Sequence, residues 1–519
     1  MKNLLVALSF ACLALASEPR GWADENPVSP ESLPLDGASR EAALNNPTAR
    51  EAHLQWLSTR SREGAAWGDF EPSLVSSVTE SGQHRLNNAQ NRVSQLGQQD
   101  YVERKAEYDL ALEGKFLSGA DYRLGYSLSK TESSLIIGSE YETFLGLTLT
   151  QPLLKGAVQR APLSAIRLGR LDSLIAFHTY RKQLMSVVSG VESAYWDLVL
   201  AQELTRVAEG SVRMATGLLE DARQRLVVGK LSELDVTEAD TQLRLRAAEL
   251  EGRRLDVVEA AARLRLLMAG DIARAPGQLS AADPLAPEQW DPQKFLADAA
   301  ALPARASVLQ PDIDIRRANV EKGRIDLNTQ RDQHLPDLNA RASYGFQGLG
   351  DDPHSAMYML QTQGFPSWSL SLELHLPVLG DLKGGGAVEA ATLGSQVAVG
   401  NLQAVERETI MTVEALVQRV LTYGKNAENN KAVSGFRKQL LDVELQRFQA
   451  GKSDIRRIYD LEQGFADAQQ KELESYNRFR KSTVDLASSA GTTLLNKGLE
   501  TLEGGRIVLS AALLDEKPR

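Results

Sequence analysis

Alternation of apolar and polar residues marks several segments of the chain. On residues 368–376 the apolar positions are Trp368, Leu370, Leu372, Leu374 and Leu376, and the polar positions between them are Ser369, Ser371, Glu373 and His375. Residues 338–346 alternate in the same way, with Leu338, Ala340, Ala342, Tyr344 and Phe346 on one face. A period of two residues predicts β-strands with one apolar and one polar face.

The first half of the chain repeats this alternation. Its apolar positions are Leu145, Leu147 and Leu149 and, in an earlier stretch, Tyr122, Leu124, Tyr126 and Leu128. A half-buried sheet of a soluble sandwich alternates similarly. Strands of about 9–11 residues with one purely apolar face, and with aromatic residues near their ends, favour a membrane barrel.

A second periodicity, with apolar residues three and four positions apart, follows the strands. In the first half this seam comprises Val191, Ala194, Leu198, Ala201, Thr205, Ala208, Val212, Ala215, Leu219, Ala222 and Leu226. The second-half seam begins with Val413, Leu416, Val420, Tyr423 and Ala427 and becomes polar at Asn430 and Ser434, where its register is uncertain. Such spacing predicts a coiled coil, and the recurring alanines allow close helix approach.

The two halves of the chain are related by an internal repeat. Pro47 and Pro311 are 264 residues apart, as are Pro72 and Pro336; Pro152 and Pro377 are 225 apart; the Arg-x3-Gly motifs at Arg225, Gly229 and at Arg447, Gly451 are 222 apart. The first half therefore carries about 39 additional residues between Pro72 and Pro152.

The N-terminus predicts a secretory signal. Lys2 precedes an apolar run over residues 4–16, which is too short to span a bilayer, and we expect cleavage after Ala23, with Ala16 as the alternative. Cys12 is the only cysteine and lies inside this run, so a mature chain has no disulfide.

The predicted organisation follows from these boundaries. We expect a signal peptide (1–23), a linker (24–35), a first repeat (36–270, with an extra hairpin at about 80–135), an inter-repeat segment (271–300), a second repeat (301–497) and a C-terminal tail (498–519). A helix over about 155–226 would be roughly 105 Å long. The helices expected at about 36–65 and 232–268 match it end to end, and four to six strands leave open sheet edges that favour self-assembly into a closed barrel.

Composition and motifs exclude several functions. The net charge of −10 and the pI of about 5.4 argue against nucleic-acid binding. The histidines lack metal-ligand spacing: His53, His84, His178, His334, His354 and His375. Residues 380–386 are glycine-rich but lack the Gly-Lys-Ser/Thr of a phosphate loop, and no segment after the signal has about 18 consecutive apolar residues. We therefore expect neither an enzyme nor a cofactor, nor a membrane-spanning helix.

Four motifs, in order, resemble the TolC family of outer-membrane efflux proteins over both halves of the mature chain. They are Leu35-Asp36 with Glu41-Ala42-Ala43-Leu44-Asn45-Asn46-Pro47; Gln151-Pro152-Leu153-Leu154-Lys155-Gly156; Val191-Glu192-Ser193-Ala194-Tyr195-Trp196-Asp197-Leu198; and Ala222-Arg223 with Arg225, Gly229, Asp235-Val236 and Ala239.

The resemblance implies a mainly α fold with a transmembrane β-barrel. A homotrimer in the outer membrane would share one barrel and a coiled-coil helical tunnel across the periplasm, with an equatorial belt built from residues 271–300 and the C-terminal tail. The family's barrel has four strands per subunit. The additional residues here would form either an exterior hairpin, which we slightly favour, or two more barrel strands.

The resemblance also implies functional positions. The helix-to-helix turns with Arg225, Gly229, Arg447 and Gly451 would dock a periplasmic adaptor protein, although a well-capped turn needs no partner. Asp235 and Asp460 match residues of the tunnel gate, where Arg457 replaces a carboxylate. Arg457 and Asp460 are one turn apart and would form alternating rings, local pairs or only a solvated face. Pro152 and Pro377 mark the strand-to-helix junctions.

The expected function is a passive outer-membrane conduit of a tripartite efflux or type I secretion system with an inner-membrane transporter. The sequence leaves the pump class and the exported substrate open. One alternative is a structural periplasmic coiled-coil protein of the envelope, and another is a surface-binding protein acting through the extra hairpin.

Overall fold

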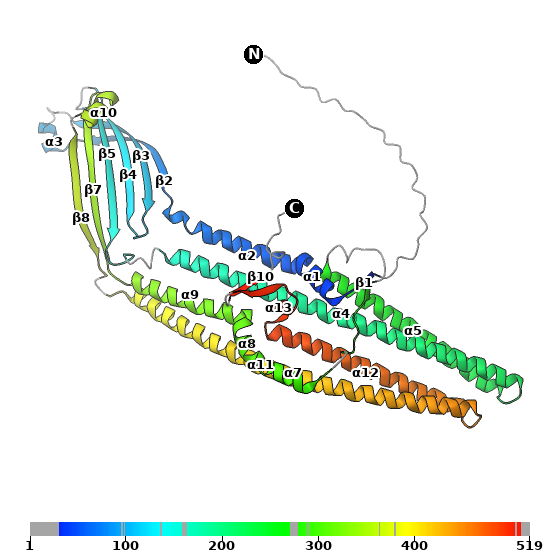
Figure 1. Cartoon of the computed structure of the whole chain (residues 1–519). Coiled ribbons are helices and arrows are strands. Elements are labelled where there is room, and N and C mark those ends of the chain that lie inside the picture. Colours follow the sequence, from blue (N-terminus) through cyan, green and yellow to red (C-terminus); the bar gives the residue numbers. More distant parts are fainter. Residues whose placement is uncertain are drawn as a thin grey trace, which may run out of the picture.

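The computed structural model describes residues 31–94, 97, 99–134, 138–157, 163–269, 279–287, 290–362, 364–377, 380–503 and 506–509. The expected signal peptide and its cleavage site therefore lie outside the described residues, as do most of the expected linker and residues 510–519. Figure 1 shows an elongated molecule with one sheet at an end and a rod of long helices extending from it.

The sheet has six antiparallel strands in the order β2-β3-β4-β5-β7-β8. Their bounds are β2 Ser73–Leu86, β3 Asp100–Lys115, β4 Asp121–Ser133, β5 Glu140–Pro152, β7 Asp337–Gly350 and β8 Phe365–His375. Short helices α3 (Ala89–Ser94) and α10 (Pro353–Thr362) lie in two of the connections at the end of the sheet remote from the rod. The strands expected from the alternating segments are present.

The additional first-half residues are part of this same sheet. Strand β2 pairs with β3 along its whole length, from Ser73 opposite Glu113 to Leu86 opposite Asp100. The first half thus contributes four strands and the second half two. From sequence these residues were expected as an exterior hairpin, which was slightly favoured, or as two more barrel strands. They pair within the sheet, and the pairing begins at Ser73, before the expected boundary at about residue 80.

Four helices lie side by side across the rod. The long helix α4 (Ser164–Val227) is accompanied by α2 (Pro47–Ala65) near the sheet and by α5 (Glu233–Met268) further out. Likewise α11 (Leu382–Gln449) is accompanied by α9 (Pro311–Gln333) and then α12 (Ile455–Ser489). In each half, two shorter helices therefore lie end to end along the side of one long helix.

The opening helix is broken where one continuous helix over 36–65 was expected. It consists of α1 (Leu35–Asn45) and α2, separated at Asn46. The Asn46 side chain accepts hydrogen bonds from the backbone N–H groups of Thr48 (2.9 Å) and Ala49 (3.4 Å). Pro47 follows as the first residue of α2, where its missing N–H removes no helical hydrogen bond, so this Asn-Pro pair starts a new helix.

The coiled-coil seam of the first half is buried. Val191, Leu198, Ala208, Ala215, Leu219 and Ala222 are all buried in α4. The hydroxyl of Thr205, which interrupts the seam, donates to the carbonyls of Ala201 (2.9 Å) and Arg253 (3.2 Å). By length and composition α4 is apolar enough to cross a membrane, but 61% of that apolar window is buried within the protein. Its hydrophobicity is therefore explained by the core of the rod.

The second seam continues through the region that the sequence left uncertain. After Ala427 the buried positions of α11 are Ser434, Leu441, Glu444 and Phe448. The carboxylate of Glu444 therefore occupies one seam position close to the end of α11.

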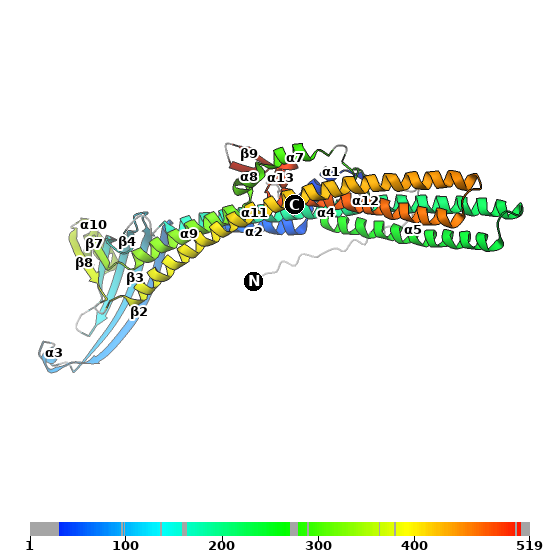
Figure 2. The ribbon, with the colours of Figure 1, turned by 90° about the horizontal axis from the view of Figure 1, so that it is seen from below.

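A belt of short elements surrounds the middle of the rod. It contains α7 (Pro292–Ala299), α8 (Leu302–Leu309), α13 (Thr493–Asn496) and two small sheets. One pairs β1 (Glu31–Leu33) with β6 (Leu279–Ala281), and the other pairs β9 (Glu500–Glu503) with β10 (Arg506–Leu509). Figure 2 shows α7, α8 and β9 on one side of the rod, midway between the sheet and the tips.

Candidate functional site

The two helix-to-helix turns at the far end of the rod have the same backbone conformation. Gly229 and Gly451 both have φ of +72°, the left-handed region that glycine enters without steric cost. In the first turn the Lys230 N–H donates to the Arg225 carbonyl at 2.8 Å, and in the second the Lys452 N–H donates to the Arg447 carbonyl at 2.8 Å. Both tips therefore have the hydrogen-bonded glycine termination that satisfies the last helical carbonyls.

The arginines of the two tips have different surroundings. Arg225 forms an ion pair with Asp221 (Nε to Oδ2, 2.8 Å), and its guanidinium lies 4.2 Å from the centroid of the Phe448 ring. Arg447 contacts Glu444 at 3.3 Å, and its side chain is 56% exposed against 21% for Arg225. Arg225 thus joins α4 to α11, whereas Arg447 is the more accessible to a binding partner.

Glu444 is a buried carboxylate that the sequence analysis did not identify. Its side chain is 7% exposed and contacts Arg447. Glu444 Oε1 also accepts a hydrogen bond from the Ser453 hydroxyl at 2.5 Å and lies 3.3 Å from Arg457 Nε. The signal was present in the sequence, because Leu441, Glu444 and Phe448 continue the seam at spacings of three and four.

Arg457 is oriented toward α11 by this contact. Asp460, one turn further along α12, is exposed, and the described part of the chain contains no ion pair between it and Arg457. Within one subunit Arg457 therefore joins the second tip to its own long helix, and the local Arg457–Asp460 pair considered from sequence is not formed.

Asp235 closes the first turn of α5. Its Oδ2 accepts hydrogen bonds from the Ser232 N–H (2.9 Å) and hydroxyl (2.7 Å), while the Ser232 hydroxyl accepts from the Asp235 N–H (3.3 Å). These bonds hold the pKa of Asp235 below its usual value. The pair is a capping box, which fixes the helix start without a second helix.

Neighbouring ion pairs connect the two helical hairpins near the tips. Arg456 of α12 contacts Glu238 of α5 at 3.1 Å. One to two turns further from the tip, Arg246 of α5 contacts Glu462 of α12 at 2.6 Å, and these two side chains are 12% and 8% exposed. Ion pairs between α5 and α12 therefore hold the two helical hairpins together here. Asp235 does not take part in them, because its side-chain hydrogen bonds are made to Ser232 of its own turn.

Capped turns connect the sheet to the helices. Pro152 is the last residue of β5 and lies opposite Asn339 of β7. Pro377 follows β8, and its carbonyl accepts from the Gly380 N–H at 3.3 Å, where Gly380 has φ of +83°. The Asp381 carboxylate then accepts from the Gly384 N–H at 2.8 Å and caps α11. The glycine-rich segment is thus a turn followed by a helix start.

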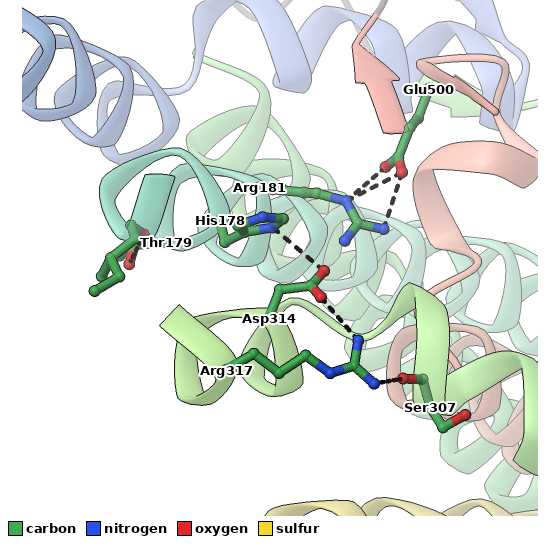
Figure 3. Close-up of polar contacts among 8 residues, drawn as sticks. His178, Thr179, Arg181, Ser307, Asp314, Arg317 and Glu500 are labelled. Carbon is green, nitrogen blue, oxygen red and sulfur yellow. Dashed lines mark hydrogen bonds and ion pairs between the residues drawn. The ribbon is translucent and has the colours of Figure 1, made fainter. Parts of the chain in front are cut away.

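A buried polar cluster joins the belt to α4, as Figure 3 shows. Arg181 of α4 faces Glu500 of β9, with Nε 3.0 and 3.1 Å from the two carboxylate oxygens, and neither side chain is exposed. On the same helix His178 Nδ1 lies 3.6 Å from Asp314 of α9. Asp314 also pairs with Arg317, whose guanidinium donates to the Ser307 carbonyl of α8.

Burial dominates the protonation of this cluster. Burial raises the pKa of Glu500, opposed by its contacts with Arg181. Burial lowers the pKa of His178, with a further lowering from Arg181 and an opposing effect of Asp314. Among the described residues no group of histidine, cysteine, aspartate and glutamate side chains is arranged to hold a metal ion. The contacts of this cluster join α4 to β9 and, through α9, to α8.

Comparison with known proteins identifies the fold and gives a family match for the first half of the chain. A family model described as Outer membrane efflux protein matches residues 38–270. Among solved structures, the CmeC outer membrane channel of Campylobacter jejuni aligns with a TM-score of 0.62, 16% identity and coverage of 88% of this chain and 86% of that chain. The outer membrane protein VceC of Vibrio cholerae aligns with a TM-score of 0.61, 13% identity and coverage of 88% and 96%.

A third structure, the open state of the MtrE outer membrane channel of Neisseria gonorrhoeae, aligns with a TM-score of 0.61, 15% identity and 89% coverage of each chain. A search of curated proteins gives no match. At these identities the structures establish the shared fold, and the family match covers most of the expected first repeat. Residues 38–270 thus match the outer membrane efflux protein family, the TolC-like family that the motifs resemble, and the whole chain shares the fold of these channels.

Proposed function

We propose that this chain is one subunit of a homotrimeric outer-membrane channel. The sheet contributes strands to one barrel in the membrane, and the helical rod contributes to a tunnel through the periplasm. The channel is a passive conduit of a tripartite efflux or type I secretion system, and its inner-membrane transporter supplies the energy.

The exposed apolar face of the sheet carries this proposal. Trp368, Leu370 and Leu372 of β8 are 74, 72 and 70% exposed, so no described part of the chain covers their side chains. Large apolar patches on a protein surface mark contact with a membrane or another protein. Because the same face also presents leucines and tyrosines on the neighbouring strands, hydrocarbon is the environment that fits it.

The two edges of the sheet support assembly with other copies. Strands β2 and β8 are the outermost strands and each has one neighbour. In a bilayer, unpaired N–H and C=O groups of an edge strand would face hydrocarbon without hydrogen-bond partners, which a closed barrel avoids. Strand pairing between neighbouring copies satisfies these edges, and three copies match the trimer that the family resemblance implies.

The tips are the proposed docking surface for a periplasmic adaptor protein. They are the most distant part of the rod from the sheet and present two turns of identical backbone, with Gly229 and Gly451 at their ends. Arg447 is the accessible cation of this surface.

Three copies of Arg457 and Asp460 would surround the tunnel mouth. Their side chains are exposed within one subunit, one turn apart on α12. In a trimer they would form neighbouring positive and negative rings, so we propose a gate of mixed charge. Asp235 supports this gate indirectly, by fixing the start of α5.

Membrane fractionation and cross-linking test the proposed function. A channel subunit will appear in the outer-membrane fraction, migrate differently on gels before and after heating, and cross-link to a trimer. A soluble monomeric protein would instead support the structural periplasmic alternative. Protease shaving of whole cells addresses the surface-binding alternative, because cleavage within the β2–β3 connection that leaves export unchanged would separate the hairpin from channel function.

A further inference from the structure

The apolar face of the sheet forms a continuous band across all six strands. On each strand the band has a middle residue, and the pairing between strands shows how that position changes across the sheet. A barrel strand crosses a membrane at a tilt of about 35–45°. In a flat membrane the band must therefore move along the strands from one strand to the next.

Three strands establish the direction of this movement. The apolar run of β8 is centred on Leu372, which lies opposite Ala340 of β7. The run of β7 is centred two residues further toward the exterior, at Ala342, which lies opposite Leu149 of β5. The run of β5 is centred two residues further still, at Leu147. The band thus moves steadily away from the rod.

The additional strands continue the same movement. On β4 the run Tyr122, Leu124, Tyr126 and Leu128 is centred one residue beyond the position opposite Leu147. On β3 the run is centred on Leu110, opposite Tyr126. On β2 the apolar residues Leu74 and Val78 flank Ser76, which lies opposite Leu110. The band therefore extends onto β3 about one residue further out, and onto β2 without a further shift.

The movement corresponds to a membrane-barrel tilt. From β8 to β2 the centre shifts by about six residues, or about 20 Å along the strands at ~3.4 Å per residue. The five spacings between strands, at ~4.8 Å each, span about 24 Å. The ratio gives a tilt of about 40°, within the range for transmembrane barrels. A hairpin in water would have no reason to keep this alignment.

We propose that β2 and β3 also cross the outer membrane, so that three subunits close an eighteen-stranded barrel. The surface formed by Leu74, Val78, Tyr108, Leu110 and Leu112 contacts bilayer hydrocarbon, and β2 pairs with β8 of the next copy. This inference rests on the proposed channel function and raises the four strands per subunit that the family resemblance implies to six, so that the barrel has eighteen strands instead of twelve.

The opposite face of the additional strands is that of an aqueous lumen. On β3 it carries Lys105, Glu107, Asp109 and Glu113, and Arg123 of β4 forms ion pairs with both Asp109 and Glu113. Charged side chains of alternating sign are stable beside water and costly in hydrocarbon. The two faces of β3 therefore differ, with one apolar and the other charged.

The width of the sheet also matches the rod. At ~4.8 Å spacing and about 40° tilt, six strands occupy about 38 Å of barrel circumference and four strands about 25 Å. Four helices side by side, at about 9 Å between axes, occupy about 36 Å. Six strands per subunit therefore allow barrel and tunnel to meet at nearly equal circumference.

Strands β2 and β3 also extend beyond the band. Eight residues of β2 follow Val78, up to Leu86. From the band centre at Ser76, the ten residues up to Leu86 rise about 26 Å at the same tilt, so the strand ends about 13 Å beyond a hydrocarbon band ~25 Å thick. The β2–β3 hairpin thus has a membrane-embedded base and a polar exterior top.

Spin-label accessibility of single-cysteine variants tests the proposal. In the full-length chain with Cys12→Ser, which removes the only natural cysteine, Leu110→Cys and Val78→Cys report on the additional strands. Leu372→Cys of β8 is the matched control, because the 40° tilt places Leu372 and Leu110 at equal depth. Ser77→Cys and Ser371→Cys report on the lumen face. The trimer is reconstituted in liposomes, and collisions of each label with oxygen and with a water-soluble nickel chelate are compared.

We expect labels at Leu110 and Val78 to be as accessible to oxygen, and as protected from nickel, as the label at Leu372, within about twofold. Labels at Ser77 and Ser371 should contact nickel readily. If Leu110 and Val78 contact nickel while Leu372 does not, β2 and β3 lie outside the membrane and the eighteen-stranded barrel is wrong, but the channel proposal stands. If Leu372 contacts nickel as well, the proposed membrane channel itself fails.

Discussion

Arg181 and Glu500 form an ion pair with no exposed side-chain surface, with Arg181 Nη2 2.9 Å from one carboxylate oxygen. The partners are 319 residues apart, so the pair fixes the C-terminal β9 against the first long helix. Removing both charges from water is costly, and the contacts between them offset that cost only while both are present.

We expect Arg181→Ala to reduce the free energy of unfolding by about 3–5 kcal/mol, because it leaves Glu500 buried and unpaired. The double variant Arg181→Met with Glu500→Leu removes both charges at similar volume and should recover most of this loss. The denaturant midpoint of the trimer in detergent measures both effects. If the single and double variants lose the same free energy of unfolding, the unpaired charge of Glu500 is not the cause of the loss.

A second prediction concerns the pH dependence of stability around His178. Burial lowers the pKa of His178, so the folded chain binds its proton less readily than the unfolded chain, whose pKa is about 6.5. Stability from neutral His178 is therefore fully present above pH ~6.5 and is lost as the pH falls below it. One such group contributes a slope of at most about 1.4 kcal/mol per pH unit.

Melting temperatures at pH 7.5, 6.5 and 5.5 isolate this contribution when the chain is compared with His178→Gln. The original chain should lose more stability between pH 6.5 and 5.5 than the variant. Glu500 acts in the opposite direction, since its raised pKa favours the folded state at lower pH, but it is present in both proteins. Equal slopes for the original chain and His178→Gln would exclude a buried neutral imidazole.

Local sequence signals predicted the elements better than their connections. Leucine alternation located the strongest strands, and seam spacing located the long helices. Strand β2 was obscure because Ser76 interrupts its apolar face, and its place in the sheet is visible only through the pairing with β3. The break at Asn46-Pro47 was missed because the residues on both sides favour a helix, and only the capping side chain of Asn46 indicates that a new helix starts there. Glu500 had no local signal, because its partner lies on a distant helix.

The tips provide a prediction about docking. Ala at position 229 or 451 must adopt φ near +72°, which costs an L-residue about 1–2 kcal/mol and distorts the turn. We expect Gly229→Ala with Gly451→Ala to reduce cross-linking to the adaptor encoded with this channel by fivefold or more, while the trimer persists. Gly252→Ala, an exposed position within α5, serves as the control. Unchanged cross-linking would move the docking surface away from these turns.

The proposed gate makes opposite predictions for its two charges. Loss of a negative ring favours anions and loss of a positive ring favours cations, because fixed charges concentrate counter-ions at a narrow mouth. In planar bilayers under a salt gradient, Asp460→Ala should therefore shift the reversal potential toward anion selectivity, and Arg457→Ala toward cation selectivity. Single-channel conductance should change in both variants.

Arg457→Ala has a further consequence that separates charge from conformation. The substitution also removes the contact with buried Glu444, which retains Ser453 and Arg447. Glu444→Gln weakens the same contact without altering an exposed charge, so it should change opening frequency but leave selectivity near that of the original chain. Arg254→Ala, an exposed position of α5, controls for loss of a cation elsewhere. If Asp460→Ala and Arg457→Ala both match Arg254→Ala, neither residue lies at the mouth, and the narrowest part of the tunnel must be sought elsewhere along the rod.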